Sequence, residues 1–426
     1  MKYCDNSIHS SCLGCVPQKM ASGFFISRSH LKGFMQTSYK SLLAGVVAIL
    51  IGLCTCSGAA FGAGKPHYVV TNDDVPPELI STISFFTVGT NGQLTMKAKV
   101  LVGEGGIAGG YFAANRVNVL DSGNAECVYA SVAADGDVVG ISVKTLTIAG
   151  HTTGSKKDTG ASNGIGLAMN PQYLYASFTD SSNIGTFQVL PGCKLKFVSD
   201  ITVAGLQGGI VDGMVIHGDM MVVTYGDGSI ESFNISAGVP VSNGDEQNST
   251  GSRGGNTYPS AIDITQDGHY AIFGDTSPFT VIEVSDISSG KLTPTVVYHL
   301  GNAINASNIL LSPDETLLYI SNNQSGKITA AFFDKSKGTL SKGCVSRFLK
   351  GFVSDWSYTA SLALQKTTGT GDMLYVAEYG APSSIGEIEV TSSGGKCTLT
   401  ESSKSPIADP NSPGLLSIGA FPPRPF

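Results

Sequence analysis

A short pattern of apolar and polar positions recurs along most of the chain. Its clearest copy has an apolar run at 307–312, a turn at Pro313-Asp314-Glu315, and a second apolar run at 317–322 that ends in Ser and Asn. Short apolar runs bounded by turn residues are typical of buried β-strands, and Pro and Asp favour the turn between them. The chain is therefore predicted to be a repeat protein built from hairpins.

Each copy has a position that corresponds to Tyr319 of the clearest one. These positions recur in steps of 46 to 60 residues, at Val69, Tyr129, Tyr175, Val222, Ile272, Tyr319 and Tyr375. A period of roughly 40 to 50 residues made of short strands, about four to a unit, is typical of a β-propeller. We therefore predict an all-β chain that forms a seven-bladed β-propeller.

The two ends of the repeat region predict how the ring closes. The first copy begins at His67 and has no apolar strand of its own upstream, whereas the run 414–421 follows the last copy and has no hairpin partner. We predict that 414–421 is the inner strand of blade one. Closure of this kind leaves no terminal blade with an open edge.

The first 63 residues have the pattern of an export segment. An apolar run at 42–54 follows Lys40 and precedes small residues at 57–63, which is the order found in secretory signals. The run is shorter than the roughly 20 residues of a membrane span, so cleavage near residue 62 or 63 is expected. An uncleaved membrane anchor is the alternative. We predict an N-terminal extension at 1–63 and a propeller at 64–426, in the periplasm or outside the cell.

The net charge limits the choice of partners. Without residues 1–63 the chain loses five of its 26 basic and one of its 33 acidic side chains, which leaves 21 against 32, a balance of −11. Such an acidic chain, without clusters of Lys or Arg, disfavours nucleic acid and anionic membrane surfaces. The expected partner is a small-molecule or carbohydrate ligand, or a protein of the cell envelope, and a monomer is expected.

Four cysteines follow the export segment, at positions 127, 193, 344 and 397. An even number in an exported protein permits two disulfides. Three of them, however, follow turns at comparable places in different copies of the repeat, and equivalent sites on different blades are expected to lie far apart. Unpaired strand residues fit this pattern as well as disulfides do, so no pairing is predicted.

Side chains that could carry chemistry are few. The five histidines after residue 63 are not spaced as metal ligands, and no Gly-x-Ser-x-Gly, phosphate-loop or His-Glu-x-x-His motif is present, so neither a metal nor a cofactor is expected. Acidic residues follow the second strand of most copies and could line a central pocket, at Asp73, Asp74, Asp180, Asp227, Asp275 and Glu378. Turn formation is the competing explanation, since Asp is favoured at such loop positions. Trp356, the only tryptophan, could stack on a sugar or serve in packing.

Particular strands and turns resemble those of the seven-bladed lactonase-like propellers, the group that includes 6-phosphogluconolactonases and carboxymuconate cyclase-like proteins. The resemblance is carried by Tyr-Val-Val-Thr-Asn at 68–72, Leu-Tyr-Ile-Ser-Asn at 318–322, Ser-Pro-Asp at 312–314, and Ile-Thr-Ala-Ala-Phe at 328–332 with the Gly-Thr-Leu turn at 338–340. It covers about residues 67–421. These segments build blades, so the resemblance is specific for the fold and weak for the chemistry.

The resemblance also implies where catalytic residues would lie, and this chain departs from it there. The enzymes have an Arg-His pair before the inner strand of a late blade, a Glu that closes the next strand, and a His in the blade before. In this chain those four positions hold Ser307, Asn308, Asn323 and Ser260. Uncharged side chains can neither bind a phosphate by charge nor act as a general base near neutral pH.

These observations leave three hypotheses. The first is an exported binding or scaffold propeller that lacks the lactonase residues, with ligand contacts from Asp73, Asp180, Asn308 and Trp356. The second is a lactone hydrolase or lactonising isomerase that uses another residue set, for which the weak candidates are Asp275, Asn323 and Glu378. The third is an anchored surface protein whose ring meets another protein. The sequence leaves open whether the chain is an enzyme.

Overall fold

The structure is a computed structural model that describes most of the repeat region. The described residues are 66–73, 80–104, 115–122, 125–133, 136–153, 166–178, 182–248, 261–274, 281–294, 296–300, 306–352, 358–367, 371–380, 383–409 and 414–423. They belong to one compact unit, Gly62–Phe426. The predicted export segment lies outside the described residues. Within the described part, no helix is both long enough and apolar enough to cross a membrane.

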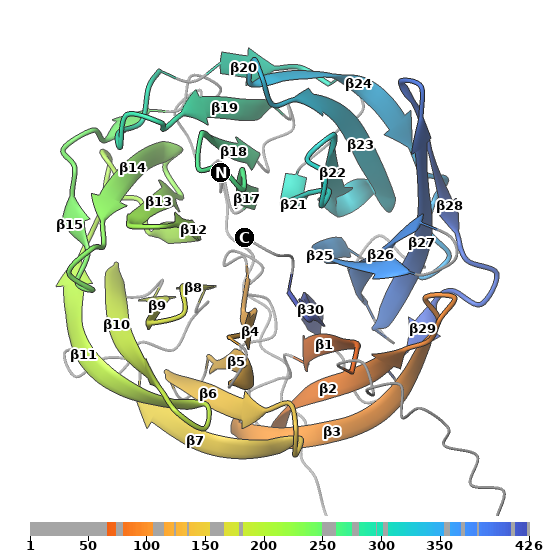
Figure 1. Cartoon of the computed structure of the whole chain (residues 1–426), viewed down its shortest axis with the longest axis horizontal. Helices are drawn as coiled ribbons and strands as arrows, with labels where there is room; N and C mark the ends of the chain where they lie inside the picture. The colour runs from red at the N-terminus through yellow and green to blue at the C-terminus, as the bar shows by residue number, and fades with distance from the viewer. Residues whose placement is uncertain are drawn as a thin grey trace, which may run out of the picture. The chain divides into compact units, whose positions relative to one another are not determined.

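The described strands form seven antiparallel sheets, each of which is one blade (Figure 1). From the innermost strand outward, blade one contains β30 (Leu415–Phe421), β1 (Tyr68–Asp73), β2 (Ile80–Val88) and β3 (Leu94–Glu104). In the same direction, blade two contains β4 (Val117–Asp121), β5 (Glu126–Val132), β6 (Asp137–Ser142) and β7 (Thr147–Thr153). Blade three contains β8 (Gly166–Met169), β9 (Tyr173–Phe178), β10 (Asn183–Leu190) and β11 (Lys194–Thr202).

The remaining four blades follow in chain order. Blade four contains β12 (Val211–His217), β13 (Met220–Tyr225), β14 (Ser229–Asn234) and the short outer strands β15 (Val241–Ser242) and β16 (Gln247–Asn248). Blade five contains β17 (Ala261–Ile264), β18 (Tyr270–Gly274), β19 (Ile282–Asp286) and β20 (Val296–Tyr298). Blade six contains β21 (Ala306–Leu311), β22 (Leu317–Asn322), the 3-10 turn η1 (Asn323–Ser325), β23 (Lys327–Asp334) and β24 (Thr339–Val345). Blade seven contains β25 (Tyr358–Thr367), β26 (Gly371–Tyr379), β27 (Ser384–Ser393), β28 (Lys396–Glu401) and β29 (Ile407–Ala408).

The predicted seven-bladed β-propeller is confirmed. The innermost strands of successive blades contact one another in the order β30, β4, β8, β12, β17, β21, β25 and back to β30. Each residue that corresponds to Tyr319 lies in the second strand of its blade and has no exposed surface. The repeat pattern therefore identified the same structural position in every blade.

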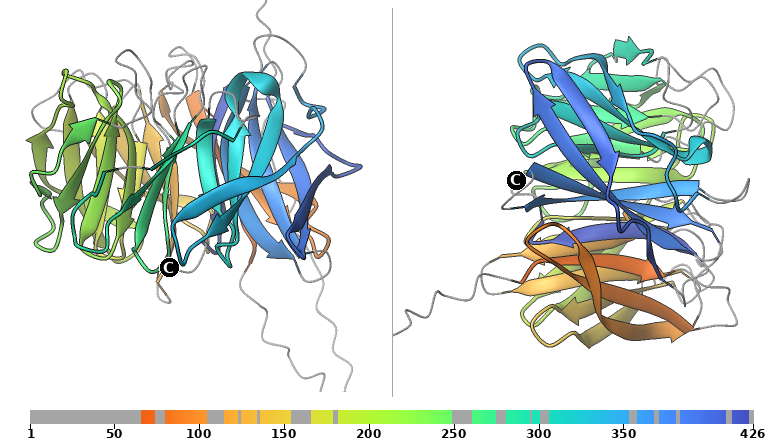
Figure 2. Two further views of the ribbon diagram at one scale, coloured as in Figure 1. Left: turned by 90° about the horizontal axis from the view of Figure 1, so that it is seen from above. Right: turned by 90° about the vertical axis from the view of Figure 1, so that its right-hand side faces the viewer.

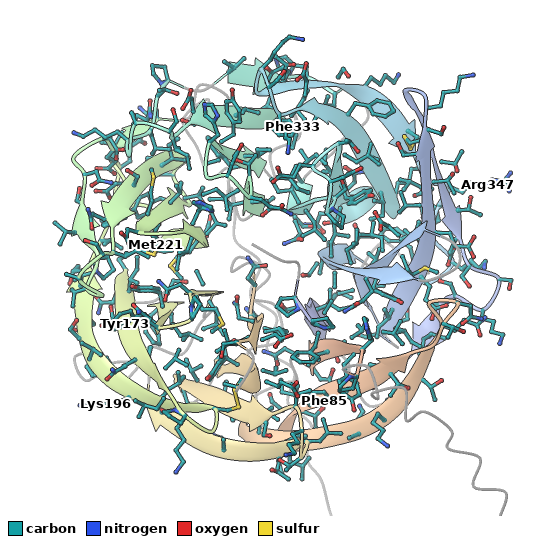
Figure 3. The ribbon with its side chains drawn as sticks, in the orientation of Figure 1. Phe85, Tyr173, Lys196, Met221, Phe333 and Arg347 are labelled. Carbon is teal, nitrogen blue, oxygen red and sulfur yellow. A yellow bond between two sulfur atoms is a disulfide. The ribbon has the colours of Figure 1, made fainter. Side chains whose placement is uncertain are left out.

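Strand alternation explains how the core is divided. Successive side chains of a strand point to opposite faces of the sheet, so each blade buries one set of residues against the preceding blade and the other against the next. In β1, Val69 packs against blade seven and Val70 against blade two. Seven apolar clusters result, one between each pair of neighbouring blades. Side views show the twist of each sheet from its inner to its outer strands (Figure 2). Among the labelled side chains, Phe85 and Met221 lie within blades, whereas Lys196 and Arg347 lie at the outer edge of the ring (Figure 3).

The last strand of the chain lies in the first blade. β30 pairs antiparallel with β1, from Tyr68 opposite Phe421 to Asp73 opposite Leu415, with an irregularity between Asn72 and Asp73. Phe421 is fully buried among residues of blades one and two. Blade one is thus assembled from residues of both ends of the repeat region.

The expectation that cysteines at equivalent sites lie far apart is wrong. Disulfides join Cys127 to Cys193 and Cys344 to Cys397. Cys344 and Cys397 lie on β24 and β28, the outer strands of blades six and seven, which stack against each other. The other pair joins β5 of blade two to the outer turn of blade three. Blades adjacent in the ring pack face to face, so similar positions on neighbours approach each other.

Part of the polar segment after blade four belongs to the sheet of that blade. β15 and β16 both pair with β14. Asp245, in the turn between them, accepts hydrogen bonds from Ser232 N (3.0 Å) and, across to blade five, from Leu292 N (2.8 Å). Residues 249–257 lie outside the described residues.

Candidate functional site

The two residues at the expected Arg-His position lie at the start of β21, where this strand bulges against β22. Ser307 is 8% exposed, and its Oγ donates to the carbonyl oxygen of Thr359 in blade seven (2.5 Å) and lies 2.7 Å from Ser321 Oγ. Asn308 is 4% exposed, and its Oδ1 accepts a hydrogen bond from Leu362 N in blade seven (3.2 Å). Both side chains therefore bind blade six to blade seven.

Asn323 stands where the enzymes have a Glu. It is the first residue of η1, directly after β22, and is 4% exposed. Its Oδ1 is buried and has no hydrogen-bond partner among the described residues. A buried amide oxygen without a partner is costly, so this atom is a candidate acceptor for a bound donor.

Glu378 lies near the end of β26 and is 2% exposed. Its Oε2 accepts a hydrogen bond from Ser384 Oγ (2.6 Å), whereas its buried Oε1 has no partner within the described structure. Burial, together with the negative charge of Glu401, raises the pKa of Glu378 to about 7 in spite of the Ser384 hydrogen bond. This carboxyl can therefore take up and release a proton near neutral pH.

The structure brings Asn308, Asn323 and Glu378 to the same junction, between blades six and seven. Leu374 and Val376, the alternate residues that share a strand face with Glu378, pack against blade six, which places Glu378 toward that blade. Thr359 connects the two sides, because it pairs with Glu378 across β25 and β26 and its Oγ1 donates to the Asn322 carbonyl oxygen (2.9 Å). Two of the three residues of the second hypothesis thus lie at one location.

The junction around Glu378 is tightly packed. A Cβ atom added to Gly351, in the segment between β24 and β25, would lie 1.6 Å from Glu378 Oε2. One added to Gly386 would lie 2.8 Å from Oε1. The two glycines allow main chain to pass close to the carboxyl group and leave no room there for a larger side chain.

Asp73, predicted as a ligand contact, lies at a different junction. It ends β1 with no exposed surface and accepts hydrogen bonds from Thr71 Oγ1 (2.8 Å), Ser84 Oγ (2.7 Å) and Thr82 Oγ1. Burial and the nearby carboxylate of Asp409 raise the pKa of Asp73 to about 6. Its oxygens are thus occupied within the protein. The other predicted residues, Asp74, Asp180, Ser260, Asp275 and Trp356, lie outside the described residues.

Turn formation accounts for several other acidic residues. Asp227 accepts hydrogen bonds from Ser229 Oγ (2.7 Å) and from the backbone N–H groups of Gln207 (2.7 Å) and Gly209 (3.1 Å). Burial opposes ionisation of Asp227, but these hydrogen bonds outweigh it and lower its pKa. Asp227 therefore holds a turn together, as the competing explanation proposed for these residues.

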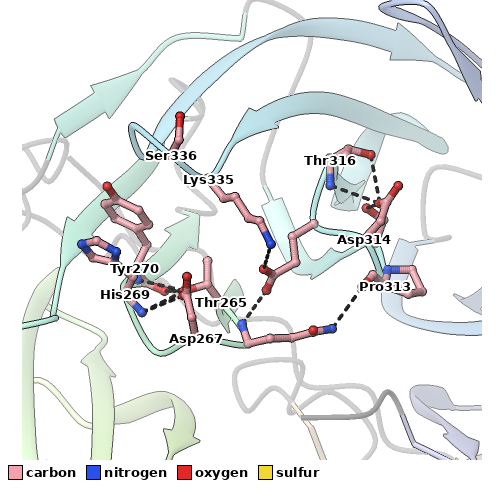
Figure 4. A network of polar contacts seen from close by, with 12 residues as sticks. Thr265, Asp267, His269, Tyr270, Pro313, Asp314, Thr316, Lys335 and Ser336 are labelled. Atoms are coloured by element: carbon pink, nitrogen blue, oxygen red, sulfur yellow. Dashed lines mark hydrogen bonds and ion pairs between the residues drawn. The ribbon is translucent and has the colours of Figure 1, made fainter.

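The Pro-Asp turn of the repeat pattern shows the same chemistry (Figure 4). Asp314 accepts hydrogen bonds from Ser312 Oγ (2.7 Å) and Thr316 Oγ1 (2.9 Å), and in the matching turn of blade five Asp267 accepts one from Thr265 Oγ1 (2.7 Å). Burial raises the pKa of both aspartates less than the hydrogen bonds lower it.

Gln266 ties these two turns together. Its Nε2 donates to the carbonyl oxygen of Pro313 (3.1 Å), and its backbone N–H donates to Glu315, which lies 3.5 Å from Lys335 Nζ (Figure 4). The turn residues on which the family resemblance rests are therefore part of the contact between blades five and six.

Two buried charged residues at the start of innermost strands were not among the predicted site residues. Arg116 precedes β4 and is 1% exposed, and Asp212 on β12 is also 1% exposed. The carbonyl oxygen of Arg116 accepts the N–H of Ser131, two residues after Tyr129, just as Asn308 pairs with the residue two after Tyr319. Arg116 is thus the counterpart of Asn308 in blade two. The alignment of repeats could have found it, had it been extended from the second strands to the residues that precede the first.

No metal centre is assembled from the described residues, since no group of three or more His, Cys, Asp or Glu side chains there could hold an ion. His269, for example, is 42% exposed, stacks on Tyr270 with ring centroids 4.5 Å apart, and lies 3.4 Å from Asp286. It is a surface residue of blade five.

Comparisons with known proteins agree on the fold. No family model and no curated protein matches the chain. Among solved structures, a protein of unknown function from Desulfotomaculum acetoxidans is 16% identical with a TM-score of 0.58 over 83% of this chain and 98% of its own. A candidate 6-phosphogluconolactonase from Bacteroides fragilis is 13% identical with a TM-score of 0.51, over 65% of this chain and 79% of its own.

A third solved structure is the periplasmic gluconolactonase of Pseudomonas aeruginosa, which is 15% identical with a TM-score of 0.50 over 66% of this chain and 82% of its own. At such identities the likeness concerns the fold alone, because one propeller architecture supports many activities. The seven-bladed propeller fold expected from the strands and turns is therefore confirmed, and the fold by itself does not assign an activity.

Proposed function

We propose that this chain, a seven-bladed propeller with the fold of the lactonase-like proteins, acts outside the cytoplasm as a ligand-binding or scaffold protein. Its main support is the engagement of Ser307 and Asn308 in hydrogen bonds between blades six and seven. These side chains are neutral and already have partners where the family's enzymes have charged groups. Lactone hydrolysis by the family's residues would need a positive charge or a general base at that place.

Location outside the cytoplasm is supported by two features of the chain. Disulfides persist in oxidising compartments, and this chain has two that join neighbouring blades. The apolar run at 42–54 has the pattern of a secretory signal. The periplasmic gluconolactonase shows that the fold occurs in such a compartment, although the likeness extends to the fold alone.

The test is a pair of assays on the purified chain 64–426. A panel of sugar lactones and aromatic lactones is expected to give no turnover above the rate in buffer. A panel of sugars, sugar acids and short oligosaccharides is expected to contain at least one compound that raises the melting temperature, because a ligand that binds only the folded state stabilises it. Turnover of any lactone, or the absence of both a ligand and a partner from the cell envelope, would contradict the proposal.

A second candidate is a lactone hydrolase with its own residue set, and one observation favours it. Glu378 is a buried carboxyl with a pKa of about 7 at the same junction as Asn323, whose Oδ1 has no partner among the described residues, and such a group suits general acid or base catalysis. Close packing by Gly351 and Gly386 argues against substrate access. Lactone turnover that is lost in Glu378→Gln but kept in Asn308→Ala would establish this alternative. The role of Asp275 can be tested with a substitution in the same assay.

A further inference from the structure

Blade seven has buried carboxyl groups on both of its faces. Glu378 faces blade six, whereas Glu387 on β27 accepts a hydrogen bond from Leu94 N of blade one (2.8 Å). Asp409, which follows β29, lies 2.5 Å from Lys99 of blade one. Exposed fractions are 2% for Glu378 and 0% for Glu387 and Asp409. The contacts of this blade with both of its neighbours therefore include carboxyl groups away from water.

Each of these three carboxyl groups has an oxygen without a hydrogen-bond partner among the described residues. The atoms are Glu378 Oε1, Glu387 Oε2 and Asp409 Oδ2. An ionised carboxylate that is buried with an unpaired oxygen is destabilising, and protonation removes most of that cost. Glu378 and Glu387 are accordingly placed to hold a proton better than a charge, whereas Asp409 has Lys99 beside it as counter-charge.

Compensating positive charge is scarce on the face toward blade six. The charged neighbour of Glu378 there is Glu401, which repels it. Lys350 lies nearby, but its Nζ donates to the carbonyl oxygens of Ser402 (2.9 Å) and Ser405 (3.3 Å). Its backbone N–H bonds to Glu401 instead (3.1 Å).

The face toward blade one has one lysine between two carboxylates. Lys99 Nζ is 2.5 Å from Asp409 Oδ1 and 3.6 Å from Asp73 Oδ2. Glu387 is near Lys404, whose Nζ donates to Gln93 Oε1 (2.8 Å). The imidazole of His67, also at this junction, lies 3.0 Å from Gln365 Oε1 and is exposed.

The position of these groups matters because this junction also contains the strand that joins the two ends of the repeat region. Asp409 comes shortly before β30, and its backbone N–H donates to the carbonyl oxygen of Ser383 (3.0 Å). Asp73 is the last residue of β1, opposite Leu415 of β30. Repulsion between Asp73 and Asp409 therefore acts at the point where β30 enters blade one.

We propose that blade seven is a proton-dependent lock of the ring, in which protonation of the carboxyl groups buried on its two faces holds it against blades six and one, and their ionisation loosens it together with β30. This is a conformational role, independent of whether the chain binds a ligand or has an activity. Loosening would uncover the apolar sheet faces between blade seven and its two neighbours at neutral or alkaline pH, and mild acid would close them.

The direction in which pH changes the stability of the folded chain follows from the difference between the folded and unfolded pKa values. Burial and then Glu401 raise the pKa of Glu378 from 4.5 to about 7, and burial and then Asp409 raise that of Asp73 from 3.8 to about 6. Burial also raises the pKa of Glu387. The folded state thus holds protons that the unfolded state has released, so the contribution to stability is complete below about pH 4 and is lost as the pH rises through 6 and 7.

Hydrogen exchange measured by mass spectrometry at pH 5.0, 6.0, 7.0 and 8.0 tests the lock on the chain 64–426 with both disulfides intact. Protection factors, corrected for intrinsic exchange, are compared for peptides covering β26 and β30, with β13 of blade four as internal reference. We expect protection of β26 and β30 to fall at least tenfold relative to β13 between pH 5.0 and 8.0. A constant ratio, or one that rises with pH, would overturn the proposal.

Two variants that replace a carboxyl group with an uncharged amide, together with one control, test whether the carboxyl groups cause the pH dependence of protection. Glu378→Gln is expected to flatten the pH profile of β26, and Glu387→Gln that of β30 in blade one, whereas His67→Gln keeps the wild-type profile of both. A profile that survives both carboxyl substitutions, or disappears in His67→Gln, would also overturn the proposal. If one carboxyl variant fails to fold, the proposal is tested with the other variant. The urea midpoint of the wild-type chain, measured across the same pH range, then shows whether stability falls as the pH rises.

Discussion

The hydroxyl of Tyr375 in blade seven donates a hydrogen bond of 2.6 Å to the carbonyl oxygen of Gly92 in the outer hairpin turn of blade one. Gly92 has φ of +80°, the left-handed conformation that an Asn-Gly hairpin turn requires. At the same place between blades three and four, Tyr175 donates to Gly238 (2.7 Å). One position of the repeat thus fastens a blade to the turn of the next.

Two other blades have a tyrosine at this position without the hydrogen bond, and each of them has a disulfide to the next blade. The hydroxyl groups of Tyr129 and Tyr319 are buried and have no partner in the part of the chain that the structure describes. The blades that carry these tyrosines are joined to their next neighbours by the two disulfides. Equivalent junctions of the ring are therefore held by two different kinds of bond.

Replacement of Tyr375 by Phe is expected to destabilise the chain by about 1 to 2 kcal/mol, because the Gly92 carbonyl oxygen loses its buried donor. The urea midpoint at constant m-value measures this change. Tyr319→Phe is the matched control and should be neutral or slightly stabilising, since its hydroxyl is buried and has no partner among the described residues. Equal losses in the two variants would show that ring packing, and not the hydrogen bond, sets the effect.

Loss of either disulfide is expected to lower stability by roughly 4 kcal/mol. The paired cysteines are separated by 66 and 53 residues, and closing loops of that size restricts the unfolded chain. Thermal unfolding of the Cys344→Ser/Cys397→Ser and Cys127→Ser/Cys193→Ser variants measures each contribution. A chain that melts at the same temperature with and without reductant would contradict the pairing.

The fold was predictable from the sequence because the residues that build a blade are also those that repeat. Tyr319 and its six counterparts are core residues of second strands, so a local pattern sufficed to count the blades. The cysteine pairs were not predictable in the same way. The spacing of the cysteines along the chain indicates the blade to which each belongs. It does not indicate that adjacent blades stack closely enough at their outer strands for a disulfide to form.

The candidate site was predictable only in part. Asn323 and Glu378 could be placed near each other because both lie at the ends of second strands in adjacent blades. Their burial and the approach of Gly351 depend on a connecting segment whose path no repeat pattern specifies. Likewise, Lys99 and Asp409 are 310 residues apart and meet only because the last strand returns to the first blade.

Gly351→Ala is expected to be strongly destabilising, by about 3 kcal/mol or more. The added methyl group would lie 1.6 Å from Glu378 Oε2 and 2.4 Å from Ser384 Oγ, so these two buried side chains would have to move and their hydrogen bond would be disturbed. The urea midpoint measures the loss. Because contacting residues are energetically coupled, adding Glu378→Ala should recover part of it. No recovery in the double variant would show that main-chain contacts, and not the carboxyl group, require this glycine.

Replacement of Lys99 by Met should destabilise the chain more at pH 8 than at pH 5. The lysine is the cation between two fully buried aspartates, at 2.5 Å from Asp409 and 3.6 Å from Asp73. It opposes the rise in the pKa of Asp73 that burial and Asp409 cause, so without it Asp73 holds its proton to a higher pH than about 6. At pH 8 Asp73 is ionised in the wild-type chain, and the variant loses the counter-charge of this buried pair of aspartates, at a cost of about 3 kcal/mol.

At pH 5 Asp73 is already protonated in the wild-type chain, so the part of the loss that comes from its unpaired charge is absent. The expected loss there is about half of that at pH 8, as measured by urea unfolding at both values. Lys97→Met, an exposed neighbour on β3, is the control and should change stability by less than about 0.5 kcal/mol at either pH. A loss in the Lys99 variant that is independent of pH would mean that the lysine contributes by packing of its aliphatic part, and that Asp73 does not titrate in this range.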